Sequence, residues 1–284
     1  MSNGESVAQT PSTTPELARI ADAFVSARLQ GASLADFPGP IPDDLATAYQ
    51  VQDLAIARWP DRVVGWKVGF IAAERRDGSG DDRLLGPIFA RGLLDASLDD
   101  LEFPIFSGGF GAVEAEYVLR LQADAPADKL DWSADDVSRV PATLHMGVEV
   151  ASSPLATINL LGPRVVVSDF GNNNGLILGA RIHDWPGIAD EKLTCQTYID
   201  DVLVGSGGAS SLPGGLRAAF AFALSRSARR GRPLKAGDLV ATGNATGIHD
   251  IVAGQTARIE FAGFGEIACR ARWATPTAAT GAAR

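Results

Sequence analysis

Two glutamates, Glu114 and Glu116, are separated by a single residue in a stretch where apolar side chains occupy every second position. This alternation over residues 111–121 is typical of a β-strand with one buried face, so both carboxylates project from the same face, roughly 7 Å apart. Neighbouring carboxylates repel each other and raise each other's pKa. Either this face lies in solvent, which screens the repulsion, or a cation lies between the two groups. The hypothesis that we follow is a divalent metal.

A third carboxylate lies on a second predicted strand, residues 143–150, in which Met146, Val148 and Val150 share one face and Glu149 points to the other. Three carboxylates from two strands form an all-oxygen ligand set, which suits Mg²⁺ or Mn²⁺ better than zinc. The alternative is that Glu114 and Glu116 line a solvated strand and that Glu149 is unrelated to them. Spacing alone leaves both interpretations open.

Lys67 is the only charged residue in the apolar run 63–70. A lysine inside such a strand is either paired with a carboxylate or has a lowered pKa, and both suit a role in proton transfer. The alternative is a lysine that guards an edge strand against aggregation.

The remaining polar motifs are less specific. Residues 237–247 predict a strand that opens into a glycine-bounded turn, whose backbone N–H groups could bind a carboxylate, although a plain hairpin loop fits as well. The run 172–174 of three asparagines is typical of a turn. His145, His183 and His249 have no partner at a diagnostic spacing, so we assign them no role.

Composition excludes several classes of function. The 284 residues are 46% hydrophobic, carry a net charge of −9 and contain no apolar run of the ~18 residues that a membrane helix needs. We therefore expect neither a nucleic acid nor a membrane as partner. The first residues lack the basic region and apolar core of a signal peptide, and Cys195 and Cys269 have no metal-type spacing, which favours a cytoplasmic protein with two buried thiols.

The order of elements predicts an α+β, β-rich protein. We expect a disordered tail over residues 1–14, a helical segment over 15–60, one β-rich domain over 61–272 and a flexible tail over 273–284. Thr14 and Asp43 or Asp44 are candidate N-caps of two helices. Residues 164–167 and 175–179 predict short strands, and the charged loop 74–83 is a candidate mobile segment.

Six short motifs occur in an order and spacing that resemble one family. They are Gly65–Gly69, Glu114–Glu116, Gly147–Glu149, Gly175–Gly179, Leu234–Asp238 and Thr242–Asn244. Together they resemble the 2-keto-4-pentenoate hydratase branch of the fumarylacetoacetate hydrolase superfamily, which also includes 4-oxalocrotonate decarboxylases. The resemblance covers about residues 15–272.

The resemblance implies a mixed β-sandwich roll with an N-terminal helical segment, holding Mg²⁺ or Mn²⁺ on Glu114, Glu116 and Glu149. It also implies substrates that are 2-hydroxy-2,4-dienoates or 2-oxo acids, as in the meta-cleavage catabolism of aromatic compounds. Such a substrate chelates the cation through its carboxylate and its 2-oxygen, and the cation stabilises enolate charge.

Individual residues match roles in this family. Lys67 corresponds to the lysine near the reacting carbons, for which we expect proton transfer. Asn244, Gly243 and Asn173 correspond to substrate-binding positions. The resemblance thus predicts a metal-dependent hydratase that protonates the dienol at its far carbon and adds water to give a 4-hydroxy-2-oxo acid. We expect it to form a homo-oligomer.

The chain departs from the family pattern at several polar positions. Leu84 replaces an aspartate, Ala112 an arginine and Asn244 a serine or threonine, while Asn173 or Asn174 replaces a serine. Asp81 or Asp82 could supply the carboxylate that Leu84 lacks. These changes leave the exact substrate open, because a site that hydrogen-bonds substrate oxygens discriminates by those contacts.

Three alternatives to the hydratase follow. A 2-oxo-acid decarboxylase of the 4-oxalocrotonate type shares nearly all of the motifs. An acylpyruvate hydrolase is disfavoured, because residues 107–113 lack the histidine that the hydrolase branch places shortly before its Glu-x-Glu. A non-catalytic partner subunit is disfavoured because all three glutamates and Lys67 are present.

Overall fold

The computed structural model of the protein describes residues 14–277. Its helices are α1 (Thr14–Gln30), α2 (Leu45–Arg58), α3 (Ile158–Leu161), α4 (Pro163–Ser168) and α5 (Gly215–Arg229). Its strands are β1 (Val63–Phe70), β2 (Arg83–Phe89), β3 (Leu93–Asp95), β4 (Glu102–Ile105), β5 (Phe110–Leu121), β6 (Ala142–Ser153), β7 (Asn173–Ile182), β8 (Thr194–Ile199), β9 (Val202–Gly208), β10 (Leu239–Ala241), β11 (His249–Asp250), β12 (Thr256–Phe261) and β13 (Gly265–Trp273). This α+β, strand-rich architecture confirms the predicted fold class.

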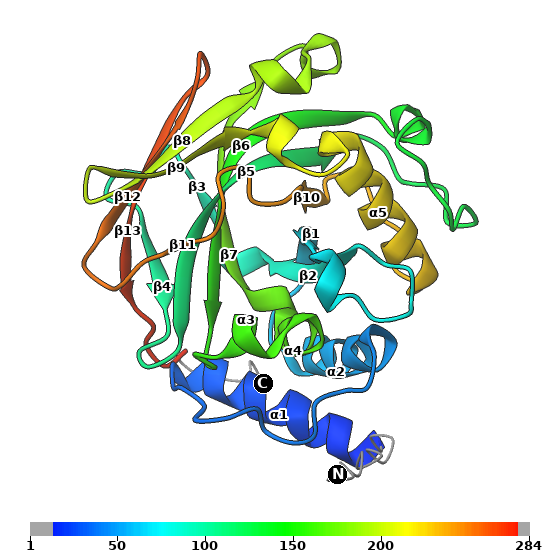
Figure 1. Cartoon of the computed structure of the whole chain (residues 1–284), viewed down its shortest axis with the longest axis vertical. Helices are drawn as coiled ribbons and strands as arrows, with labels where there is room; N and C mark the ends of the chain where they lie inside the picture. Colours follow the sequence, from blue (N-terminus) through cyan, green and yellow to red (C-terminus); the bar gives the residue numbers. More distant parts are fainter. Residues whose placement is uncertain (1–13, 278–284) are drawn as a thin grey trace, which may run out of the picture.

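Two mixed sheets build the molecule (Figure 1). The larger sheet has the strand order β2-β1-β10-β5-β6-β7-β3, with the short β11 also paired to β5. The smaller sheet has the order β4-β13-β12-β8-β9. The pairs β1–β10, β3–β7 and β4–β13 are parallel. The larger sheet curls so that β2, at one end of this order, also contacts β7 near the other end.

The register assigns side chains to the two faces of the larger sheet. Lys67 lies opposite Ala241, which in turn lies opposite Val118 on β5. Paired residues share a face, and so do residues two and four positions along a strand. Lys67, Glu116 and Glu114 therefore project from one face, while the opposite face packs into the main hydrophobic core.

The helical segment packs against one end of the larger sheet (Figure 1). Helix α1 contacts α2, and α2 contacts α4. The Asp44 side chain caps α2 by accepting a hydrogen bond from the Thr47 N–H at 2.7 Å, as predicted. Helix α1 begins at Thr14, so the predicted N-cap is itself in the first turn.

The prediction of a strand over residues 164–167 is wrong. These residues form helix α4, in which Pro163 occupies the first position and the Ser168 hydroxyl donates back to the Arg164 carbonyl. The three valines favour a strand locally, but Val165 and Val167 are fully buried, so tertiary packing outweighs their intrinsic preference. The neighbouring prediction, a strand over residues 175–179, is confirmed by β7.

The loop 74–83 is tied to two helices. The Asp77 carboxylate accepts from the Leu45 N–H at 2.7 Å, and Asp81 forms an ion pair with Arg226 of α5. The predicted tail 1–14 lies outside the described residues except for Thr14, and residues 278–284 of the C-terminal tail lie outside them too. Within the described part of that tail, the Thr277 N–H donates to the Leu29 carbonyl.

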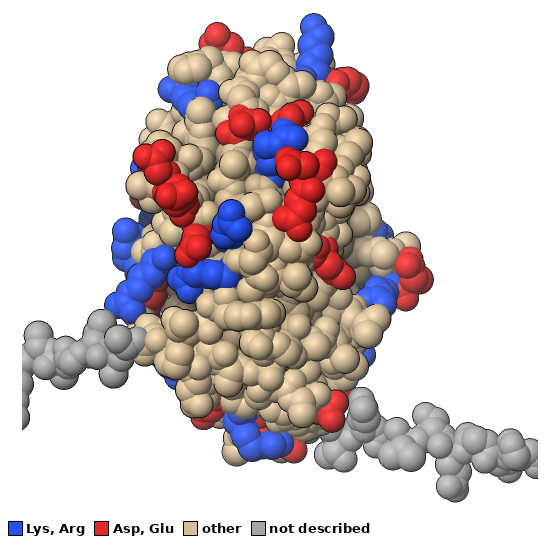
Figure 2. All heavy atoms as spheres, turned by 90° about the vertical axis from the view of Figure 1, so that its left-hand side faces the viewer, with Lys and Arg blue, Asp and Glu red and all other residues tan. Residues whose placement is uncertain are grey.

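The surface viewed in Figure 2, on the side of the smaller sheet, carries Lys and Arg side chains interspersed with Asp and Glu side chains. This face therefore offers no continuous basic stripe among its described residues. None of the helices within residues 14–277 combines the length and apolarity that crossing a bilayer requires.

The close approach of β1 to β10 predicts that Gly65 does not tolerate a larger residue. A Cβ on Gly65 would overlap the carbonyl oxygen and the Cβ of Leu239. We expect Gly65→Ala to lower the free energy of unfolding by about 1–3 kcal/mol, as measured by urea denaturation. Gly78→Ala, which adds a Cβ in open space, is the control and should change it by less than about 0.5 kcal/mol. Equal stability of the two variants would contradict this packing.

Candidate metal centre

Three glutamates of the larger sheet form a buried cluster. In the antiparallel pairing of β5 with β6, Glu114 lies directly opposite Glu149, and Glu116 lies two residues further along the same face. One carboxylate oxygen from each residue lies within 4.8 Å of the others. The exposed fractions of Glu114, Glu116 and Glu149 are 3%, 0% and 0%. Strand β5 is buried on both faces, so solvent does not screen the repulsion between the carboxylates.

Burial and mutual repulsion dominate the electrostatics of this cluster. Burial, followed by the charge of Glu149, raises the pKa of Glu114 from 4.5 to about 7. The same two causes, together with the charge of Glu114, raise the pKa of Glu116 well above its usual value. Several negative charges in a water-free space are costly unless positive charge or protons compensate them.

Hydrogen bonds satisfy only part of the cluster. The Gly243 N–H donates to Glu116 Oε2 at 2.7 Å, and the Asn173 side-chain amide donates to Glu149 Oε1 at 3.2 Å. The second oxygens, Glu116 Oε1 and Glu149 Oε2, have no hydrogen-bond partner among the described residues. Buried oxygens without a donor, on three convergent carboxylates, fit the ligand set of Mg²⁺ or Mn²⁺.

Lys67 is the cation that the structure provides beside the cluster. Its Nζ lies 3.4 Å from Glu149 Oε1, and its side chain is almost fully buried. Burial acts to lower the pKa of Lys67, but the charges of Glu149, Glu114 and Glu116 outweigh burial and raise it. Strand β1 lies between β2 and β10, so the alternative of an edge-strand lysine is wrong.

The turn after β10 contacts the cluster directly. Gly243, with a φ of +120° that favours glycine, directs its N–H to Glu116, and the Asn244 side chain hydrogen-bonds Glu114. The Thr242 hydroxyl anchors the turn by donating to the Tyr117 carbonyl at 2.7 Å. The predicted substrate-binding residues Asn244, Gly243 and Asn173 therefore all contact a glutamate of the cluster, while their contact with a substrate remains a prediction.

Asp81 and Asp82, the predicted replacements for a missing carboxylate, do not join the cluster. Asp81 pairs with Arg226 and Asp82 with Arg83, so both carboxylates are engaged elsewhere. Leu84 is buried and lies opposite Gly69, so an apolar side chain occupies the position for which the resemblance implies an aspartate.

The remaining thiols and histidines play local roles. Both cysteines are buried, and burial raises the pKa of Cys195 to about 12. His145 hydrogen-bonds the Gly179 carbonyl, and His249 hydrogen-bonds Thr246. Neither histidine is part of the carboxylate group suited to a metal.

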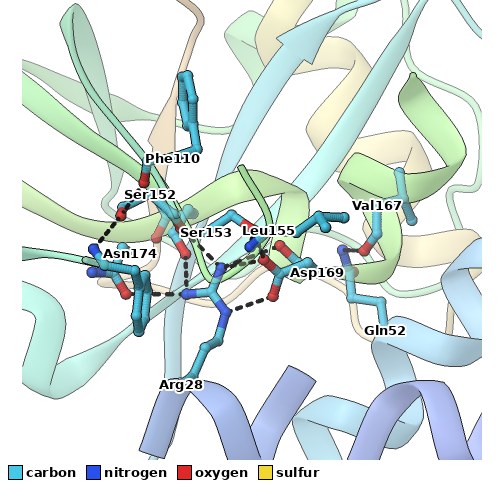
Figure 3. A network of polar contacts seen from close by, with 11 residues as sticks. Arg28, Gln52, Phe110, Ser152, Ser153, Leu155, Val167, Asp169 and Asn174 are labelled. Carbon is cyan, nitrogen blue, oxygen red and sulfur yellow. Dashed lines mark hydrogen bonds and ion pairs between the residues drawn. The ribbon is translucent and has the colours of Figure 1, made fainter. Parts of the chain in front are cut away.

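Sequence reasoning missed Arg28 of α1 and Asp169, which form a buried ion pair (Figure 3). Arg28 also donates to the Asn173 carbonyl at 3.1 Å, and the side chain of Asn173 contacts Glu149. A signal was present in the sequence, since Arg28 follows Phe24 and Ala21 at helical spacing and so continues the apolar stripe of α1. A charge on the buried stripe of a helix requires a buried partner.

Comparison with known proteins supports the fold. No protein-family model matches the chain. Among solved structures, 4-oxalocrotonate decarboxylase from Pseudomonas putida G7, complexed with magnesium and adipate, matches 92% of this chain and 100% of its own chain with a TM-score of 0.75 at 20% sequence identity. The same enzyme complexed with calcium and acetate matches the same shares, also at 20% identity, with a TM-score of 0.73.

A protein from Yersinia pestis CO92, described as a member of the fumarylacetoacetate hydrolase family, also matches. It covers 75% of this chain and 94% of its own chain, with a TM-score of 0.53 and 17% identity. The predicted fumarylacetoacetate hydrolase-like fold is therefore confirmed. Both decarboxylase structures hold a divalent cation, and this chain has a buried group of three carboxylates suited to one.

The raised pKa of Glu114 predicts how stability depends on pH. The folded, metal-free protein retains a proton that the unfolded chain releases above its ordinary pKa of 4.5, so stability falls as the pH rises towards about 7. In thermal unfolding between pH about 5 and about 8, the Tm of Glu114→Gln should therefore fall less than that of the wild type. Glu191→Gln, at an exposed turn, is the control and should follow the wild type.

Mg²⁺ should stabilise the wild-type protein more at pH about 8 than at pH about 5, because protons compete with the cation for the carboxylates. Stabilisation by Mg²⁺ that is independent of pH, or that persists unchanged in Glu114→Gln, would contradict this assignment of the cluster.

Proposed function

We propose that the chain is a divalent-metal-dependent lyase of the fumarylacetoacetate hydrolase superfamily, and that its substrate is a 2-hydroxy-2,4-dienoate or a related 2-oxo acid. The observation that carries the proposal is the buried cluster of Glu114, Glu116 and Glu149 beside Lys67. Two oxygens of this cluster have no hydrogen-bond partner among the described residues, which accords with a role as cation ligands. The fold match to a magnesium-bound decarboxylase along its whole length supports the same class.

The three glutamates would hold Mg²⁺ or Mn²⁺. When bound, the cation supplies Lewis-acid stabilisation of the negative charge that develops on the 2-oxygen of the substrate. The Gly243 backbone N–H and the Asn173 side-chain amide hydrogen-bond Glu116 and Glu149, so donors from two different segments preorganise the ligand set.

Lys67 is the proton-transfer residue of this proposal. Its pKa is raised by the neighbouring carboxylates, so it is protonated at neutral pH and acts as a general acid. If a bound cation neutralised the carboxylates, burial would be the main influence on Lys67. The pKa of Lys67 would then fall, and its proton would be easier to transfer.

Hydration is the first candidate reaction. Lys67 would donate its proton to the far carbon of the dienol, and the enol O–H would return a proton to Lys67, which gives a conjugated ketone. Water would then add across the C=C bond, with its oxygen at the position β to the ketone and its hydrogen at the α carbon. Asn244 retains a side-chain amide that can donate to a substrate oxygen, although it replaces the family serine or threonine.

Decarboxylation of a 4-oxalocrotonate-type substrate is the second candidate, and Leu84 favours it. Hydration needs a second group to activate water, and the side chain where the family has an aspartate is apolar. Loss of CO₂ needs a stabilised negative charge and one proton donor, which the glutamate cluster with its cation and Lys67 supply. The full-length fold match to a 4-oxalocrotonate decarboxylase supports this alternative.

Product analysis tests the two candidates directly. Incubation with Mg²⁺ and 2-hydroxypenta-2,4-dienoate should yield a 4-hydroxy-2-oxo acid if the chain is a hydratase. Incubation with 4-oxalocrotonate should release CO₂ if it is a decarboxylase. Turnover of neither compound, by a protein that binds Mg²⁺, would refute both candidates and favour a non-catalytic partner subunit.

Lys67→Met should separate chemistry from metal binding. The variant keeps the bulk of the side chain in its buried position but lacks the transferable proton, so kcat should fall by about 100-fold or more. Titration calorimetry with Mn²⁺ should show that the variant still binds the cation. Lys192→Met, at an exposed turn, is the control and should leave kcat unchanged. An unchanged kcat in Lys67→Met would remove Lys67 from the mechanism.

A further inference from the structure

Arg28 of helix α1 lies at the centre of a buried polar network (Figure 3). Its exposed fraction is 5%, and its guanidinium pairs with both oxygens of the Asp169 carboxylate. The same guanidinium donates to the carbonyl of Asn173 at 3.1 Å and to that of Ser152 at 3.0 Å. Arg28 thus joins the helical segment to the end of β6 and to the start of β7, where neighbours of Glu149 lie.

The network encloses a turn with unusual backbone geometry. Phe170, Gly171 and Asn172 all have left-handed backbone conformations, with φ values of 52°, 66° and 65°. Phe170 carries a bulky side chain that disfavours this conformation, so surrounding contacts must hold the turn in place. Asp169, immediately before the turn, receives Arg28 and also the Ser153 hydroxyl at 2.6 Å.

This turn contacts Lys67 and is followed by Asn173, which contacts Glu149. A Cβ on Gly171 would lie 3.2 Å from Lys67 Cε, so the turn forms a wall against the lysine side chain. At the end of the turn, the Asn173 amide donates to Glu149 Oε1, the same oxygen that Lys67 approaches. A shift of the turn would therefore displace a donor to Glu149 and the packing surface of Lys67 together.

We propose that Arg28 is a positioning residue of the metal centre, acting through the turn 169–173 to orient Glu149 by way of Asn173. The proposal rests on the metal centre described above and goes beyond it by assigning the helical segment a part in the site. Arginine suits this role because its planar group reaches the carboxylate and two carbonyls at the same time. A lysine would keep the charge but offer donors from a single atom.

Mn²⁺ affinity, measured on the full chain by titration calorimetry, tests this role without a substrate. Arg28→Lys should weaken Mn²⁺ binding by about 10-fold or more, the usual effect of removing a residue that orients a ligand. Asn173→Ala should weaken it similarly. The double variant should be no weaker than the weaker single variant, because both changes disrupt one chain of contacts.

Phe24→Leu is the matched control, because Phe24 is a fully buried residue of α1 that packs against Phe37. It should lower the Tm while leaving the Mn²⁺ dissociation constant within about twofold of the wild type. An equal loss of affinity in Phe24→Leu would overturn the proposal, since general loosening of α1 would then explain it. Additive effects of Arg28→Lys and Asn173→Ala would overturn it as well.

Mn²⁺ binding by the wild-type chain distinguishes a failure of this inference from a failure of the proposed function. If the wild-type chain binds no Mn²⁺, both proposals fail. If it binds Mn²⁺ and Arg28→Lys binds equally well, only the role of Arg28 fails. Should Arg28→Lys not fold, Ser153→Ala removes a hydrogen bond to Asp169 and must weaken Mn²⁺ binding by more than about twofold, and an unchanged affinity overturns the proposal.

Discussion

Three carboxylates on one water-free face of a sheet are the constraint on which the rest of the structure depends. When ionised, the three carboxylates carry more negative charge than Lys67 alone can compensate, and two of their oxygens have no hydrogen-bond donor among the described residues. The register between β5 and β6 places Glu114 opposite Glu149, and a slip by one residue would turn the carboxylates of the slipped strand towards the apolar core. Gly243 and Asn173, which donate hydrogen bonds to the cluster, lie in segments that are held by their own buried hydrogen bonds. The cluster therefore depends on the segments next to β10 and β7, and on Lys67 of β1.

Sequence patterns within a single strand predicted part of this site, whereas contacts between strands distant in sequence leave no such pattern. Alternation along one strand placed Glu114 and Glu116 on the same face, while the absence of other charges around Lys67 left a buried lysine and an edge-strand lysine both open. Alternation also made a ligand set with Glu149 one of two open interpretations. The family resemblance favoured that set and added Asn173, because pairing between distant strands leaves no local pattern. The alternation also suggested one solvated face, whereas the larger sheet curls and buries both faces of β5.

The wrong prediction for residues 164–167 and the missed role of Arg28 also depend on contacts with segments distant in sequence. Residues 164–167 predict a strand because three valines favour strands locally, and only the packing of helix α4 against α2 and the sheet decides otherwise. A basic residue in the last turn of a helix is ordinary, so the residue type of Arg28 alone predicts no buried role. Its position on the apolar stripe carried the information, but the partner, Asp169, is distant in sequence and could not be identified without the fold.

The parallel pairing of β1 with β10 has a consequence for how the protein folds. Lys67 pairs with Ala241, so the strand that carries the lysine gains one of its two neighbours only after the residues up to Ala241 have been synthesised. Until then, β1 exposes an unpaired edge and an apolar face, which are the features that promote aggregation during synthesis. Such non-local pairing is slow to form, and hairpin formation with β2 covers only the opposite edge of β1, so the edge that faces β10 stays unpaired until residues 239–241 are in place.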